Sequence, residues 1–280
     1  MRWTATPHFG AVVWKQRGIL PEKIQFYTHQ VEALSNPDPA WHVPPNALER
    51  AKSNLHALQL REEGETRTLY ALASCNLDMI ILHGIQMQGA DLDFVVITRK
   101  MAVYISCKYW DCAHITITGD GAFLPAYVTD THPTVTLQGH SDNRIDTLRQ
   151  TNNATLSQLQ HTWIRFFSLD PEMYRTMVVF TNPNNTLHDH RIEPVQPVVK
   201  TEDAAEAVMQ MEWDTSPLVV PRSKSACESL ARKIILQHRP STRYQTCPLC
   251  GSRLSTCENE HGISYLICSK FPDCTYMQSL

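Results

Sequence analysis

The sequence lacks the features that would place the chain in a membrane or send it out of the cell. No apolar run approaches the roughly 20 residues that a membrane-spanning helix needs. The N-terminus, Met1–His8, has no apolar core of the kind that a signal peptide contains. We therefore expect a cytoplasmic protein with no membrane partner.

The chain also lacks a strong charge of one sign. The formal net charge of its 280 residues is -3. A nearly neutral surface does not attract nucleic acid as a whole, so any such binding must use local patches of basic residues. The sequence shows no internal repeat and no low-complexity tract.

Cysteine is present in an odd number, nine, and five of the nine are scattered along the chain. Scattered thiols are typical of a reducing cytoplasm, where cysteine binds metal or packs as a small apolar residue. We expect the scattered residues to play that packing role. They are Cys75, Cys107, Cys112, Cys227 and Cys257.

The other four cysteines form the strongest motif in the chain. Cys247 and Cys250 are separated by two residues, and after a gap of seventeen residues Cys268 and Cys274 follow. Structural zinc takes four N or S ligands in a tetrahedron, and two such loops supply them. The segment is too short to bury a core, but metal binding can drive its folding instead. The spacing predicts a zinc ribbon; free or disulfide-bonded cysteines are the alternative.

The remaining pattern predicts an α/β domain with a mixed sheet. Six prolines make residues 1–45 look irregular, and a helix follows, capped by Asn46 with Glu49 as in a capping box. A second helical stretch is expected over 63–72. Runs rich in Val, Ile, Tyr and Thr then predict a meander of strands. We expect an N-terminal extension (1–45), an α/β domain (46–200), a helical connector (201–240) and the ribbon (241–280). The expected strands are 78–83, 91–98, 101–109, 114–118 and 176–181, and the later helices are 141–167, 201–213 and 223–238.

Two of the predicted strands carry a polar group that suggests chemistry. Asp91 and Asp93 share one face of their strand, and Ser106 and Lys108 share a face of the next, because strand side chains alternate. In metal-assisted phosphodiester cleavage a carboxylate holds Mg²⁺ and a lysine stabilises charge or orients water. Acidic and basic side chains are also common on exposed strands, so the pattern alone leaves both interpretations open.

Four segments carry a resemblance to a known family: Glu63-Gly64-Glu65, 89–97, 103–110 and 177–182. With them, residues 60–185 resemble the nuclease-related domain family, a branch of the PD-(D/E)xK restriction-endonuclease-like fold. The tail resembles the zinc ribbons at the C-termini of bacterial type IA topoisomerases. Together these resemblances imply a restriction-endonuclease-like mixed sheet flanked by helices, plus a small C-terminal four-cysteine ribbon.

The resemblance also implies a set of site residues. Glu65 matches the family's helical glutamate, Asp93 its metal-binding aspartate, and Lys108 its lysine. The family's second carboxylate falls at Ser106, whose neutral hydroxyl is a poor ligand for Mg²⁺. We therefore expect weak binding of Mg²⁺ or Mn²⁺ and cleavage that is slow or absent. Asp91 can serve as a substitute ligand, and is equally well explained as a solvated acid at a strand edge.

The tail carries candidate contacts to nucleic acid. Arg243, Arg253 and Lys270 can contact phosphates. Tyr265 and Phe271 can stack on unpaired bases, or fill the small core that a ribbon needs.

These features lead to one expected function and an alternative. The first is a DNA-binding protein with metal-dependent phosphodiester cleavage weakened at Ser106. The second is a non-catalytic DNA-binding or assembly subunit of a larger complex, with the zinc ribbon binding partner proteins. The tract His188-Asp189-His190 follows a polar stretch and is predicted to be a solvated loop rather than a metal site.

Overall fold

The computed structural model describes residues 8–16, 18–36, 45–87, 90–129, 132–136, 173–192, 196–238 and parts of 247–279. The chain forms two compact units. Unit 1 contains Met1–Arg17 and Glu63–Arg239, and unit 2 contains Gly18–Glu62 and Pro240–Leu280. The predicted helix 141–167 lies outside the described residues.

Unit 1 is built on a six-stranded sheet in the order β1-β2-β3-β4-β8-β10. The middle strands β2, β3 and β4 form three strands of the predicted antiparallel meander. The fourth expected strand, 114–118, belongs to a second sheet instead. β1 lies parallel to β2, β8 parallel to β4, and β10 parallel to β8. The sheet is therefore mixed, as predicted. Its strands are β1 (Ala11–Lys15), β2 (Met79–Met87), β3 (Ala90–Thr98), β4 (Ala102–Lys108), β8 (Tyr174–Phe180) and β10 (Val198–Lys200).

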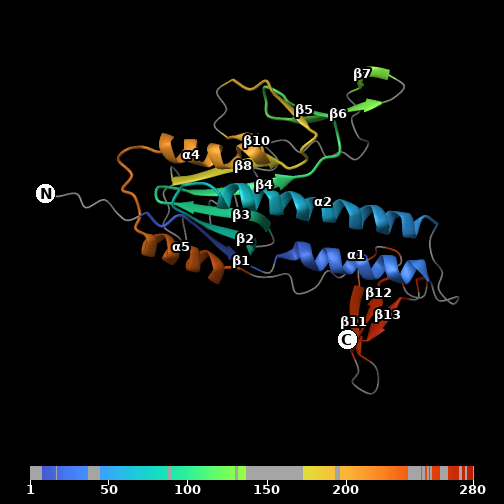
Figure 1. The fold of residues 1–280 in the computed structure, drawn as a ribbon. Coiled ribbons are helices and arrows are strands. Elements are labelled where there is room, and N and C mark those ends of the chain that lie inside the picture. Colours follow the sequence, from blue (N-terminus) through green and yellow to red (C-terminus); the bar gives the residue numbers. More distant parts are fainter. Residues whose placement is uncertain are drawn as a thin grey trace. The chain divides into compact units, whose positions relative to one another are not determined.

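Helices cover both faces of this sheet (Figure 1). On one face Ile80 and Val95 pack with Ile234 of α5 (Lys224–Leu236). On the other face Ile81 packs in a second cluster with Val208 of α4 (Ala204–Asp214). Continuous apolar runs in the central strands follow from this arrangement, because both of their faces are buried.

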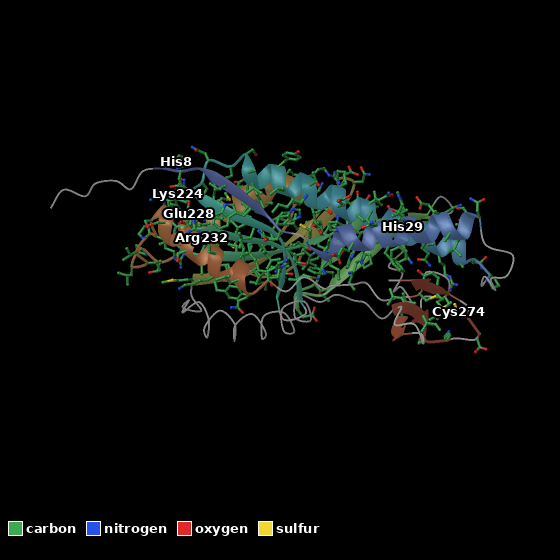
Figure 2. All side chains as sticks on the ribbon, turned by 90° about the horizontal axis from the view of Figure 1, so that it is seen from below. His8, His29, Lys224, Glu228, Arg232 and Cys274 are labelled. Atoms are coloured by element: carbon green, nitrogen blue, oxygen red, sulfur yellow. The ribbon has the colours of Figure 1, made fainter. Side chains whose placement is uncertain are left out.

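The outer face of α5 carries a row of charges one turn apart (Figure 2). Glu228 lies 3.6 Å from Arg232 and 4.0 Å from Lys224. Exposed ion pairs of this kind contribute little stability, so α5 is held mainly by its buried apolar side.

The N-terminal region is not irregular, contrary to the prediction. It contains β1 and a helix, α1 (Ile19–Ser35). Pro21 lies in the first turn of α1, where a missing N–H removes no helical hydrogen bond, so this proline does not break the helix. The start of β1 is fixed by Asp78, whose Oδ1 accepts the backbone N–H groups of Phe9 (2.6 Å) and Gly10 (2.8 Å).

A second sheet in unit 1 has the order β7-β6-β5-β9. The predicted loop around His188 is in fact strand β9, which pairs in parallel with β5. Asp189 at its end pairs with the Arg191 guanidinium (2.6 Å). The polar composition misled because β9 lies at the edge of the sheet and its side chains are mostly exposed. The strands are β5 (His114–Ile117), β6 (Phe123–Thr129), β7 (His132–Thr136) and β9 (Thr186–Asp189).

Unit 2 combines α1, the first part of α2 (Ala47–Ala73) and a three-stranded sheet. α2 is one continuous helix where two helical stretches were predicted. Leu34 of α1 and Ala51 of α2 share a buried cluster with Leu254 and Leu266 of the small sheet. The C-terminal segment therefore shares an apolar core with the two helices. Its strands are β11 (Leu254–Glu258), β12 (Ser264–Cys268) and β13 (Met277–Ser279).

Candidate functional site

A close approach between α2 and the end of β8 shapes the first candidate site. A Cβ on Gly64 would lie 2.6 Å from the Cβ of Thr181, so only glycine allows the helix to come this near. Thr181 donates its backbone N–H (2.9 Å) and its hydroxyl (3.3 Å) to the carbonyl of Lys108. Arg67 of α2 in turn donates to the Thr181 carbonyl (2.9 Å). These contacts tie the turn of α2 that carries Glu65 to the end of β4.

Glu65 is buried in unit 1, with 4% of its surface exposed. Its Oε2 lies 3.1 Å from Nε2 of His83, which is 8% exposed. The imidazole is stacked on Phe94, with ring centroids 4.7 Å apart and an interplanar angle of 20°. Sequence reasoning missed His83. The available signal was a histidine that interrupts the apolar run of β2.

Asp93 lies where the pairing of β3 with β4 ends. The last paired residues are Phe94 and Ile105. Beyond them the carboxylate of Asp93 accepts the backbone N–H of Cys107 at 2.7 Å, in place of a strand partner. Asp93 is therefore held against the segment of β4 that contains Ser106 and Lys108. The side chain of Asp91 lies outside the described residues.

Residues of β4 alternate between the two faces of the sheet. Cys107 packs in the apolar cluster with Met177 and Val179, which confirms that it is a core residue. Ser106 and Lys108 lie on the opposite face of the strand by this alternation. Ser106 is buried, and Lys108, at the end of the strand, is half-buried.

The elements just described fall inside one recognised domain. Residues 60–181 match the nuclease-related domain. The match begins on α2 just before Gly64 and ends at Thr181, so its two ends meet in the close approach described above. No curated protein and no solved structure matches the chain.

The nuclease-related segment, residues 60–181, offers a partial ligand set for a divalent cation. Mg²⁺ commonly takes one or two carboxylates from a protein and completes its shell with waters and substrate phosphates. Glu65 and Asp93 supply that number, while Ser106 adds no charge. Within the described part of the chain, no group of three or more His, Cys, Asp or Glu residues converges here. Glu65 and Asp93 are therefore the candidate ligands for a divalent cation at this site.

The second candidate site is the four-cysteine cluster of unit 2, which includes Cys274 (Figure 2). The four sulfurs lie within 4.8 Å of one another. Cys247 and Cys274 are 3.5 Å apart, and Cys250 and Cys268 are 3.4 Å apart. A zinc–sulfur bond of about 2.3 Å in a tetrahedron sets neighbouring sulfurs about 3.8 Å apart. The cluster therefore fits one zinc ion, with the four ligands that the spacing predicted.

The surroundings of Cys250 favour the thiolate that a metal needs. Burial opposes ionisation, but hydrogen bonds from Ser252 and neighbouring thiols outweigh it and lower the pKa of Cys250 to about 7. Since the thiolate is the ligand form, this thiol is prepared for metal near neutral pH.

Only some of the residues predicted to contact nucleic acid belong to the described part of the chain. Lys270 is exposed in the turn between two of the cysteines. Tyr276, another aromatic of the tail, is half-buried against the shared core of unit 2. Arg243, Arg253, Phe271 and the side chain of Tyr265 lie outside the described residues.

Proposed function

We propose that the protein binds DNA and that its nuclease-related segment holds a site for slow, metal-dependent phosphodiester cleavage. The observation that supports this most is the position of Asp93. Its carboxylate accepts the backbone N–H of Cys107 just beyond the last β3–β4 pair, in the segment of β4 that contains Ser106 and Lys108. Glu65 reaches the same unit from α2. This grouping lies within the nuclease-related segment.

Each residue then has a defined part in the proposed chemistry. Bound Mg²⁺ or Mn²⁺ supplies Lewis acidity and activates water. Asp93 and Glu65 hold the cation, and the Lys108 ammonium stabilises negative charge on the phosphate. Ser106 contributes a neutral hydroxyl where a carboxylate would bind more strongly, so the affinity for the cation is low.

Zinc has a structural part in the same proposal. The cysteine cluster holds zinc as a topoisomerase-type ribbon, and Lys270 with Arg243 and Arg253 contacts phosphates. The eight cysteines whose side chains are described form no disulfide. Free thiols and a zinc site together support a cytoplasmic setting.

A second function is favoured by the serine at position 106. A site in which Glu65 and Asp93 are each already hydrogen-bonded inside the protein also suits DNA binding without cleavage. The protein would then be a DNA-binding or assembly subunit of a larger complex. Its ribbon would bind partner proteins.

A cleavage assay separates the two functions. Zinc-loaded protein is incubated with single-stranded DNA, double-stranded DNA and RNA, in Mg²⁺ or Mn²⁺. We expect slow cleavage of DNA by the wild type, none by Lys108→Ala, and faster cleavage by Ser106→Glu, because a charged oxygen ligand is restored. Binding without cleavage in both wild type and Ser106→Glu would establish the non-catalytic function. Vigorous cleavage that survives both Asp93→Ala and Lys108→Ala would show that the reaction takes place elsewhere.

A further inference from the structure

Glu65 and His83 form a buried polar contact in unit 1. Both are more than nine-tenths buried, and they meet at 3.1 Å through Oε2 and Nε2. A buried carboxylate is costly unless it is hydrogen-bonded or paired. When Glu65 is ionised its carboxylate can only accept, and the imidazole then donates a hydrogen from Nε2 to it.

The second nitrogen of the imidazole, Nδ1, is buried and makes no hydrogen bond within the described part of the chain. The polar contact of the ring is therefore the one that Nε2 makes with Glu65. A residue of this kind positions another residue.

The same ring also connects the helix with the strand that carries Asp93. His83 on β2 pairs in register with Phe94 on β3, and their rings are stacked. Phe94 directly follows Asp93. The His83 ring therefore contacts both Glu65 of α2 and Phe94, the residue next to Asp93 on β3.

We propose that His83 is a positioning residue that fixes Glu65 as a ligand for a divalent cation shared with Asp93. The inference rests on the proposed function. Ligating carboxylates are commonly hydrogen-bonded by a partner behind them, and loss of such a partner lowers metal affinity about 10- to 100-fold. The partner matters more here, because Ser106 supplies no charged ligand and the orientation of Glu65 and Asp93 then counts for more.

Two substitutions separate positioning from simple packing. His83→Gln places an amide N–H close to where Nε2 lies, so the donor to Glu65 is kept. His83→Phe keeps a ring against Phe94 but removes the donor. Both are made in the wild type and in Ser106→Glu, on zinc-loaded full-length protein. Free Mn²⁺ is measured by electron paramagnetic resonance, and folding is followed by the thermal unfolding midpoint.

We expect His83→Phe to raise the Mn²⁺ dissociation constant by about tenfold or more, while His83→Gln stays close to its parent. Asp93→Ala should abolish the same binding. If His83→Phe does not fold, His83→Asn replaces it, since its amide is too short to reach Glu65.

Equal Mn²⁺ affinity in His83→Gln and in His83→Phe (or His83→Asn) would overturn the positioning role of His83. It would leave the proposed function untouched. Absence of Mn²⁺ binding in both the wild type and Ser106→Glu would overturn it together with the cleavage half of the proposed function. DNA binding measured on the same samples would then stand by itself.

Discussion

The two candidate metal sites of this protein differ in how far apart their ligands lie along the chain. The four cysteines come from two short loops of one C-terminal segment, and their sulfurs lie within 4.8 Å of one another. Glu65 and Asp93 come from a helix and a strand, and each is held by a different part of the fold. The spacing of the cysteines along the sequence is enough to predict the ligands of the first site. The second depends on Gly64, on the end of a strand ladder and on the unpredicted His83.

Removal of zinc should have the largest effect. Structural zinc contributes roughly 10–16 kcal/mol of apparent binding free energy, which is also folding free energy. Cys247→Ser should therefore lose the metal and unfold β11–β13. Because the cysteines share a core with Leu34 and Ala51, protection should also fall in α1 and the start of α2.

Metal analysis and hydrogen exchange measure both effects. Cys257→Ser is the control and should keep its zinc, and amides of β2 and β3 should keep their protection. Full zinc in a Cys247→Ser/Cys250→Ser double variant would disprove the ligand assignment.

Acidification should weaken zinc binding, with a smaller effect than the loss of a cysteine ligand in Cys247→Ser. The pKa of Cys250 is lowered to about 7, so its contribution is present at higher pH and is lost as the pH falls through that value. Each thiol that must lose a proton costs about tenfold in zinc affinity per pH unit below its pKa. Competition with a chromophoric chelator between pH 8 and pH 6 should show this weakening. A pH-independent affinity would exclude thiolate ligands.

The sequence was informative where one local pattern decides the structure. Runs of Val and Ile predicted the meander, and cysteine spacing predicted the ligand cluster. Prolines before Asn46 concealed β1 and α1, because a proline in the first turn of a helix is harmless. The Glu65–His83 pair could not be predicted, since the two residues lie on different elements and meet only after the sheet is assembled.

Filling the space at Gly64 tests whether the second site depends on tertiary packing. In Gly64→Ala the new methyl would lie 2.6 Å from the Cβ of Thr181, so the helix must move away from β8. Overpacking of this kind costs about 1–3 kcal/mol, offset by at most about 1 kcal/mol of helix propensity. The thermal unfolding midpoint should fall, and Mn²⁺ binding should weaken as Glu65 shifts.

The matched control is Gly119→Ala, where the nearest atom, the His190 carbonyl oxygen, lies 4.0 Å away. This variant should behave as the wild type. An unchanged midpoint and unchanged Mn²⁺ binding in Gly64→Ala would show that the close approach is not needed.

The smallest expected effect concerns single phosphate contacts by the ribbon. Lys270 is exposed in unit 2, whereas Lys233 is exposed on α5 of unit 1. Each phosphate contact contributes about one counterion to the salt dependence of DNA binding. Lys270→Ala should therefore weaken DNA binding a few-fold and lower the slope of log affinity against log salt by about 1, while Lys233→Ala leaves both unchanged. Fluorescence anisotropy at several salt concentrations measures the two quantities. Equal slopes for the two variants would mean that the zinc-binding unit does not contact phosphate through Lys270, and would favour its role as a protein-interaction module.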